Sequence, residues 1–369
     1  MNDVQESERH PPFLVTGIAG IFVVLAIAAA LVAGFTRAYG TDFYLLWVGT
    51  FFMCATPFQI MMAVVWRHEI PAPVARMAQP LKGLTLTAMF LLAGVILMPT
   101  LLYTVGQGVL TPMFVHYVIQ SVGVGLLVII IFGGWPVTKL TDNNILLGVG
   151  IVIYCYLLNF VLFKLFYHYN FFEGAPFYTA ALDPGGLFNG ITALTFAVTA
   201  VAMVMVVIMF EMWPVSKLVQ PDNQPVFGVL GTVYILVISA AVYYLFVAVI
   251  GMEPMDFMVK GPVCVIFGAF LVDNMMQFQL FAGMPQPAKG IAKSAVCLIA
   301  AAGMYQLYRA VLPLFVGSDL SVGPEGGYAQ EVWIATAMLG ITFPVINIVS
   351  GAFEFWPVRR EERAELQAK

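Results

Sequence analysis

The chain has 369 residues, of which 61% are hydrophobic and 10% charged, and its formal net charge is −4. Its mean hydropathy of +0.92 exceeds what a soluble domain of this length needs to fill a core. A slightly acidic chain without a basic patch argues against nucleic acid as a partner. The composition instead predicts that the lipid bilayer surrounds most of the chain.

Ten apolar runs follow one another, and each is long enough to cross a hydrocarbon layer of ~30 Å, which takes about 20 helical residues. They lie near residues 14–35, 43–65, 83–104, 112–134, 144–167, 187–212, 226–250, 259–282, 292–316 and 331–355. The runs lack the period-two alternation of membrane β-strands. We therefore predict an all-α polytopic membrane protein with ten transmembrane helices, in which residues 1–369 form a single transmembrane domain.

The tripeptide Trp-Pro-Val closes three of these runs, at residues 135–137, 213–215 and 356–358. Trp66 and the Gly-Met-Pro segment at residues 283–285 are interpreted as degenerate copies. The five marks stand 69, 78, 71 and 72 residues apart, and so regular a period predicts an internal repeat. Because Trp suits the membrane interface and Pro ends a helix, the motif is interpreted first as a helix stop with an aromatic anchor.

Two apolar runs fall within each period, so the repeating unit is predicted to be a helical hairpin. The chain then consists of five tandem hairpins, near residues 14–66, 83–136, 144–214, 226–285 and 292–357. Each Trp-Pro copy stands at the end of the second helix of a hairpin. All the copies are therefore expected on the same side of the membrane.

Basic residues predict which side that is, because short cytoplasmic loops are enriched in Lys and Arg. With the N-terminus inside, twelve basic residues fall on the inner side and four on the outer side. The inner set is Arg9, Arg67, Arg76, Lys82, Lys139, Lys217, Lys289, Lys293, Arg359, Arg360, Arg363 and Lys369, and the outer set is Arg37, Lys164, Lys260 and Arg309. Both termini and the Trp-Pro copies are thus predicted to be cytoplasmic, with the protein in the inner membrane.

Few residues are suited to catalysis or metal binding. The four cysteines, Cys54, Cys155, Cys264 and Cys297, fall in four different runs and are interpreted as small apolar fillers. Clustered histidines, glycine-rich phosphate loops and the GxSxG and HExxH motifs are absent from the sequence. We therefore expect no metal, no cofactor and no assigned catalytic residue, and an enzyme is the less favoured class.

The eighth run is the most polar. An ionisable side chain inside a membrane is costly, so Asp273 near mid-span is interpreted as functional by default. Asn274 and Gln277 add amide groups beside it. We hypothesise that these three residues line a substrate or ion pathway. The alternative is that Asp273 is hydrogen-bonded to a neighbouring helix and only holds the bundle together.

Lys164 and Arg309 stand near the outer ends of the first helices of two hairpins, and Asn159 precedes Lys164. If the first helices surround an axis, these residues would form a positive mouth that favours an anion. The alternative is that long cationic side chains snorkel to the interface. His116, one turn into the fourth run, is a further pathway candidate; its alternative is a hydrogen-bonded structural group.

In hairpin count and orientation, the chain resembles the group of anion channels formed by plant slow anion channels and their bacterial relatives, whose ten helices form five hairpins around a central pore. That resemblance implies no site residue here. The leading hypothesis is a membrane transporter or channel for a small solute, with an anion as one option. The alternative is a non-catalytic membrane subunit or anchor of a respiratory, enzyme or secretion complex. Assembly as a homo-oligomer or with a partner membrane complex is left open.

Overall fold

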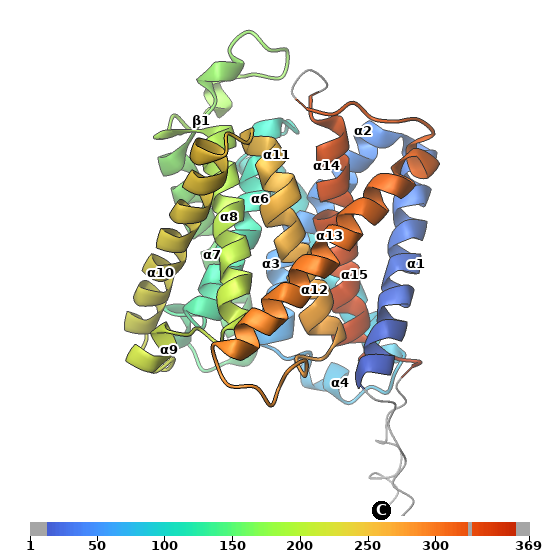
Figure 1. Ribbon diagram of the computed structural model, residues 1–369, viewed down its shortest axis with the longest axis vertical. Helices are drawn as coiled ribbons and strands as arrows, with labels where there is room; N and C mark the ends of the chain where they lie inside the picture. The colour runs from blue at the N-terminus through green and yellow to red at the C-terminus, as the bar shows by residue number, and fades with distance from the viewer. Residues whose placement is uncertain (1–12, 324–326, 359–369) are drawn as a thin grey trace, which may run out of the picture.

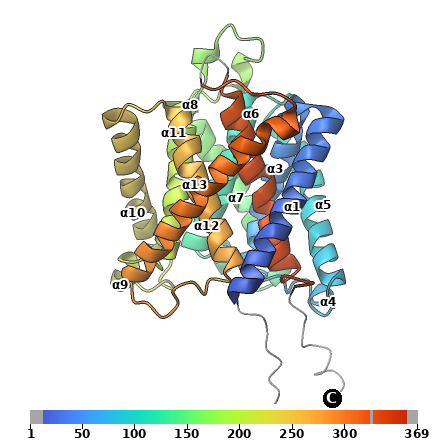
Figure 2. The same cartoon turned by 45° about the vertical axis from the view of Figure 1, so that its right-hand side comes forward.

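The computed structural model describes residues 13–323 and 327–358. Within them, ten helices are long and apolar enough to cross a membrane. Figures 1 and 2 show these helices side by side in one bundle, with α13 (Ala288–Val316) running obliquely across it. The structure therefore confirms a multi-pass helical membrane protein. Arg9 and the predicted inner basic residues after Val358 lie outside the described residues.

The odd-numbered spans lie on the outside of the bundle, and we call them peripheral helices. Each is essentially one continuous α-helix. They are α1 (Phe13–Tyr39), α5 (Leu81–Thr104), α7 (Asn144–Phe166), α10 (Val226–Tyr243) with its π-helical extension η6 (Tyr244–Val249), and α13.

The even-numbered spans lie inside the bundle, and we call them central spans. In chain order they are α2 (Thr41–Phe43), η1 (Tyr44–Val48) and α3 (Gly49–Val64); α6 (Pro112–Leu126) and η2 (Leu127–Ile131); α8 (Gly190–Met209); α11 (Pro254–Met258), η7 (Val259–Val263) and α12 (Cys264–Met275); and α14 (Ala329–Ala335), η9 (Thr336–Thr342), α15 (Phe343–Asn347) and η10 (Ile348–Ala352). Four of the five contain π-helical turns, which are uncommon and often accompany functional sites.

Short elements connect the spans. They are α4 (Ala72–Ala75), η3 (Val137–Lys139), β1 (Tyr167–His168), η4 (Asn170–Phe172), η5 (Ala180–Leu182), β2 (Phe188–Asn189) and α9 (Val215–Leu218). The two-residue strands β1 and β2 pair in parallel, with Tyr167 opposite Phe188. This pairing closes the longest loop that joins two spans.

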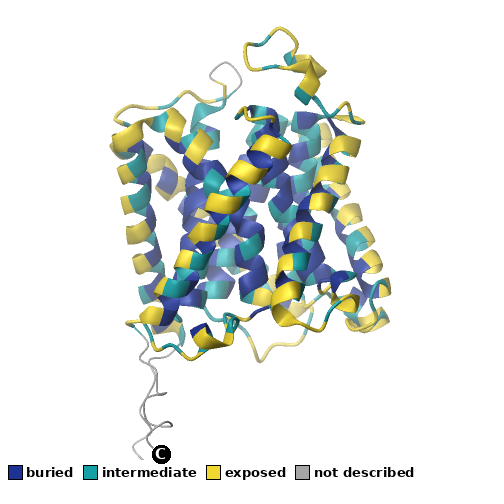
Figure 3. Cartoon of the chain, turned by 180° about the vertical axis from the view of Figure 1, so that it is seen from behind, coloured by how far each residue is buried: buried dark blue, intermediate teal, exposed yellow. Residues whose placement is uncertain are grey.

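The five central spans form a closed ring. Around it, α3 packs on α6, α6 on α8, α8 on α11 and α12, α12 on α15, and α15 on α3. Each peripheral helix covers the groove between two central spans; α5, for example, packs on α3 and η10, and α7 packs on α6 and α3. Figure 3 shows that the exposed positions follow the outer faces of the peripheral helices. The bundle thus has an axis surrounded by central spans alone.

The first helices of the pairs therefore do not surround the axis, which was the condition for the predicted positive mouth. Within an 18-residue apolar window of each span, between 44% and 72% of the residues are buried in the central spans, against 11–33% in the peripheral helices. The cause is the distribution of polar side chains, which turn away from lipid. Buried polar residues of the central spans are Thr50, Thr56, Gln59, Gln120, Ser121, Thr195, Thr199, Asp273, Glu331, Thr336 and Thr342.

All five central spans of the described chain end in the same way, with two consecutive left-handed residues. These pairs are Arg67-His68, Gly133-Gly134, Glu211-Met212, Gln277-Phe278 and Glu354-Phe355. A left-handed residue is a common helix end because it lets backbone groups of the last turn be satisfied. We call this end of the bundle the Trp-Pro end, since Trp-Pro follows three of the pairs.

These turns correct the positions of the two degenerate copies. Glu69 and Gln279 directly follow their turns and are the structural equivalents of the tryptophans. Trp66 instead stands before its turn, where its indole nitrogen donates to the Asn144 carbonyl oxygen at 2.8 Å. The segment 283–285 lies past its turn. The lengths of the apolar runs predict roughly where each central span ends. They do not predict which two residues adopt the left-handed conformation.

A second motif, Gln-Pro-x-x-Gly, begins three of the peripheral helices at residues 79–83, 224–228 and 286–290. We call each copy a Gln-Pro latch. Its glutamine accepts from the glycine backbone N–H at 3.1 Å in all three copies. The same amide donates to the carbonyl oxygens of Ala352, Ile131 and Met209, respectively, at 2.9–3.1 Å. Each latch therefore ties the start of a peripheral helix to the end of a central span.

The latch glycines let an aromatic ring approach closely. A Cβ at Gly83 would lie 2.6 Å from the Phe353 ring, and one at Gly290 would lie 2.5 Å from Phe210. Phe132 packs on Gly228 in the same way. No side chain other than hydrogen fits these sites without displacing the ring.

Candidate functional site

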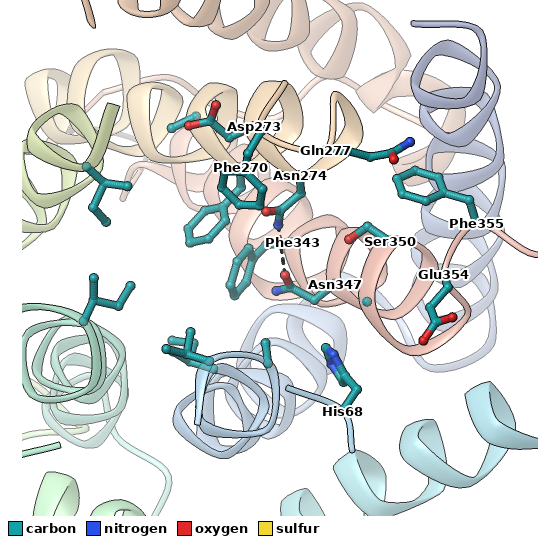
Figure 4. Close-up of a pocket in the computed structure, with 18 of the residues that line it drawn as sticks. His68, Phe270, Asp273, Asn274, Gln277, Phe343, Asn347, Ser350, Glu354 and Phe355 are labelled. Carbon is teal, nitrogen blue, oxygen red and sulfur yellow. Dashed lines mark hydrogen bonds between the residues drawn. The ribbon is translucent and has the colours of Figure 1, made fainter. Parts of the chain in front are cut away.

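A vestibule of about 760 Å³ lies on the axis and reaches the Trp-Pro end (Figure 4). All five central spans contribute to its wall, for example through Ile60, Ile130, Ile208, Asn274 and Asn347. Residues of the end turns, including His68 and Gln277, form its rim. Three of the residues predicted as a pathway line this vestibule.

Those three residues are Asp273, Asn274 and Gln277, and the structure places all of them on the wall formed by α12 and its end turn. Lys293 of α13 donates to Asp273 Oδ1 at 2.6 Å, and the two side chains are only 6% and 8% exposed. Lys293 Nζ also lies 5.9 Å from the centroid of the Phe278 ring. Asp273 is thus both part of the vestibule wall and a partner of a neighbouring helix.

Amide groups connect three of the central spans across the vestibule wall. Asn274 Nδ2 donates to Asn347 Oδ1 at 3.1 Å, as Figure 4 shows. Asn347 Nδ2 donates to Gln59 Oε1 at 3.4 Å, and Gln59 Nε2 donates to the Pro344 carbonyl oxygen at 3.0 Å. Hydrogen bonds between helices in a membrane are modest but fix their relative position. The chain of amides holds α12, α15 and α3 together beside the axis.

A second ion pair stands at the rim. Lys82 Nζ and Glu354 Oε1 are 2.5 Å apart, with the lysine 3% exposed and the carboxylate 41% exposed. His68 lies beside this pair, and its pKa is lowered to about 4, chiefly because burial removes water from the ring and secondly because Lys82 is nearby. His68 is therefore neutral at pH 7. The Glu354 carboxylate at the rim is paired with Lys82, whose side chain lies behind the vestibule lining.

The vestibule narrows toward the middle of the bundle. Phe270 and Phe343 stand with ring centroids 4.3 Å apart, and together with Leu126 they line both the vestibule and a second axial cavity. That cavity measures about 60 Å³, is lined by apolar side chains and glycine, and again receives residues from all five central spans. The two rings and Leu126 therefore form an apolar constriction between two axial spaces.

Lys164 and Arg309 do not form a mouth. Both side chains are exposed on peripheral helices, Lys164 on α7 beside exposed Val161 and Leu165, and Arg309 on α13. Neither residue lines the vestibule or the axial cavity. The predicted positive mouth is wrong, because the helices that carry these cations lie outside the ring.

Asn159 and His116 do not line the axial spaces either. Asn159 is fully buried and its Nδ2 donates to the Tyr117 carbonyl oxygen at 2.9 Å, which joins α7 to α6. His116 Nδ1 shares a hydrogen bond of 2.9 Å with the Tyr169 hydroxyl. Both contacts tie elements together, and neither side chain lines the vestibule.

Sequence reasoning missed several residues of this site. It counted Lys82 and Lys293 only as basic residues of the inner side and did not weigh Gln59 or Asn347. The sequence did contain a signal for Lys82. It occupies the same place in its Gln-Pro latch as Lys289 does in another copy, and Lys289 pairs with Glu211 at 2.5 Å. The third copy has Phe227 at that place, and Gly133 replaces the glutamate. Lysine and glutamate thus occur together in two copies and are both lacking in the third.

Comparison with protein-family models, with curated proteins and with solved structures found no match to this chain.

Proposed function

We propose that the chain is an internal repeat of five helical hairpins and that a small polar solute crosses the membrane along their common axis. The observation that carries this proposal is that two successive cavities on the axis each receive residues from all five central spans. A helical subunit that serves only as an anchor has no need of an axial space. The central spans also carry many buried polar side chains, which are costly in a membrane unless they have a role. These side chains support the same conclusion.

Two structural features that recur along the chain support the proposed repeat of helical hairpins. The five matching end turns and the three Gln-Pro latches recur once per pair of spans. A transporter assembled from internal repeats commonly places its solute path where the repeats meet. Here that meeting place is the axis.

The charge of the vestibule favours a solute without net charge. Asp273 is paired with Lys293 and Glu354 with Lys82, while the remaining polar lining consists mainly of amides. When positive and negative charges balance, the electrostatic field of the region concentrates neither anions nor cations. The proposed solute is therefore a small hydrogen-bonding molecule, and the anionic option loses the support that Lys164 and Arg309 would have given.

The positive-inside pattern supports placing the Trp-Pro end in the cytoplasm of a cell and the protein in its inner membrane. The vestibule would then open toward the cytoplasm. The apolar constriction at Phe270 and Phe343 would separate it from the outer half of the path.

Stopped-flow light scattering of proteoliposomes tests this proposal, with glycerol and urea as uncharged probes and sodium chloride as a charged one. We expect the uncharged solutes to cross faster than in empty liposomes. In a Ser350→Cys variant, a membrane-impermeant thiol reagent should abolish the added flux, because Ser350 lines the vestibule and the four native cysteines are buried.

The matched control is Ser318→Cys, an exposed position beyond the end of α13. Its modification should leave the flux unchanged. Flux that persists after complete labelling of Ser350→Cys would contradict an axial path through the vestibule.

A further inference from the structure

A second large cavity, of about 590 Å³, lies at the side of the bundle. Peripheral helices α7 and α10 flank it, and central spans α6 and α8 form its floor. Its lining is overwhelmingly apolar, and it shares no lining residue with the vestibule. A cavity with this position is reached from lipid more readily than from water, so its ligand should be an apolar molecule.

Two buried polar side chains in this lining lack a hydrogen-bond partner. Gln120 is 9% exposed and its Oε1 atom is unpaired, and Tyr167 is 1% exposed with an unpaired hydroxyl. Other buried polar atoms without a partner occur in the described residues, but their residues do not line this cavity. Because buried polar groups are normally satisfied, these two point to a ligand that supplies hydrogen-bonding groups.

Aromatic side chains give the cavity flat walls. The rings of Phe166 and Phe188 are stacked, with centroids 6.1 Å apart and planes at 15°. Phe196 and Tyr243 meet edge to face, with centroids 6.2 Å apart. All four residues line the cavity. Such walls suit a planar ring better than a flexible acyl chain, because aromatic groups interact through defined faces and edges.

The depth of Gln120 in the membrane favours a quinone over a phospholipid as the ligand. Gln120 is eight residues into α6, which begins at Pro112, so it lies about 12 Å along the helix at ~1.5 Å per residue. A phospholipid keeps its ester groups at the border of the headgroup layer and reaches this depth only with its hydrocarbon tails. A quinone carries its polar ring into the hydrocarbon region.

We propose that this cavity binds the head group of an isoprenoid quinone or quinol. The unpaired Gln120 Oε1 accepts from a quinol hydroxyl or, with the amide turned over, Nε2 donates to a quinone carbonyl, and the Tyr167 hydroxyl takes the second oxygen. The ring lies between the aromatic pairs, and the isoprenoid tail leaves between α7 and α10 into the lipid. The proposal concerns binding only. The cavity shares no lining residue with the vestibule, but it shares Ile119, Gly123, Val198 and Val201 with the small axial cavity.

Binding of decylubiquinone to the purified, delipidated full-length protein tests this assignment. Native mass spectrometry should show one ligand per chain, and a titration followed by thermal stabilisation gives the dissociation constant. Gln120→Leu and Tyr167→Phe should each raise that constant about tenfold, the effect of losing one buried hydrogen bond. Tyr44→Phe is the matched control, because Tyr44 also has a buried, unpaired hydroxyl but does not line the cavity.

A second variant keeps the test decisive if either polar change disturbs folding. Ala197 lines the cavity, so Ala197→Trp should fill it and abolish binding while the protein stays monodisperse. Equal affinity of the wild type and Ala197→Trp for decylubiquinone would overturn the proposal. Displacement of decylubiquinone by an equal concentration of dioleoylphosphatidylethanolamine would overturn it too, since that result describes an acyl-chain site.

Discussion

The ion pair between Asp273 and Lys293 should be strongly coupled. Both side chains are more than nine-tenths buried, and their charged atoms are 2.6 Å apart. Removing one partner of such a pair leaves an uncompensated buried charge and costs about 3–5 kcal/mol, whereas replacing both partners by neutral groups is often neutral or stabilising. Asp273→Asn and Lys293→Met should therefore each destabilise the protein by about 3–5 kcal/mol, and the double variant by less than either single change.

Unfolding in detergent can be followed with a thiol-reactive fluorescent dye, because all four cysteines are buried. A double-mutant cycle then gives the coupling free energy, which should be at least about 2 kcal/mol. The pair between Lys260 and Asp256, also short at 2.5 Å but 42% and 29% exposed, is the control. Its coupling should be about 0.2–1 kcal/mol, because water screens an exposed pair.

Additive effects of the two changes at Asp273 and Lys293 would refute this reasoning. The cycle also separates the two interpretations of Asp273. If Asp273 only holds the bundle together, the double variant should recover transport together with stability. If Asp273 acts in the path, the double variant should be stable and inactive.

Three further predictions concern the Trp-Pro end. Gln286→Ala should destabilise the protein by about 1–3 kcal/mol, since it removes two hydrogen bonds of its latch, whereas the exposed Gln220→Ala should have little effect in the same thermal assay. Gly83→Ala should lower the unfolding temperature because the new methyl group meets the Phe353 ring; an unchanged value would show that the ring moves freely. Because the pKa of folded His68 is lowered to about 4 from 6.5, stability should fall as the pH decreases from 6.5 to about 4, and His68→Gln should reduce that fall in pH-dependent melting curves.

The membrane-spanning segments could be predicted from composition because apolar runs of this length have few alternatives. Boundaries were less certain; the ninth span was expected from residue 292, but α13 begins at Ala288. Lys293 was therefore placed at the inner edge of the predicted span and counted with the inner basic residues, whereas it is the sixth residue of α13 and pairs with Asp273. The polarity of the eighth span, in contrast, singled out three residues that the structure places in the lining of one cavity.

The assignment of helices to the ring could not be predicted in the same way. Apolar side chains suit both lipid and a packed interior, so the hydrophobic pattern of a membrane helix says little about which face is buried. Arg309 and Lys164 looked significant because they are charged, yet both are exposed. The Gln-Pro latch was visible in the sequence as three matching segments, and its glycines would have indicated close helix contacts at the Trp-Pro end.

The central claim is that solute crosses along the axis, and widening the constriction tests it most directly. In Phe270→Ala/Phe343→Ala, the vestibule and the axial cavity should become continuous, since these rings stand between them. The double variant Phe22→Ala/Phe160→Ala removes two exposed rings from peripheral helices and is the matched control. We expect glycerol permeability of proteoliposomes to rise above the wild-type value in the first variant only. Equal permeability of the wild type, both variants and empty liposomes would contradict an axial path and favour a structural membrane subunit.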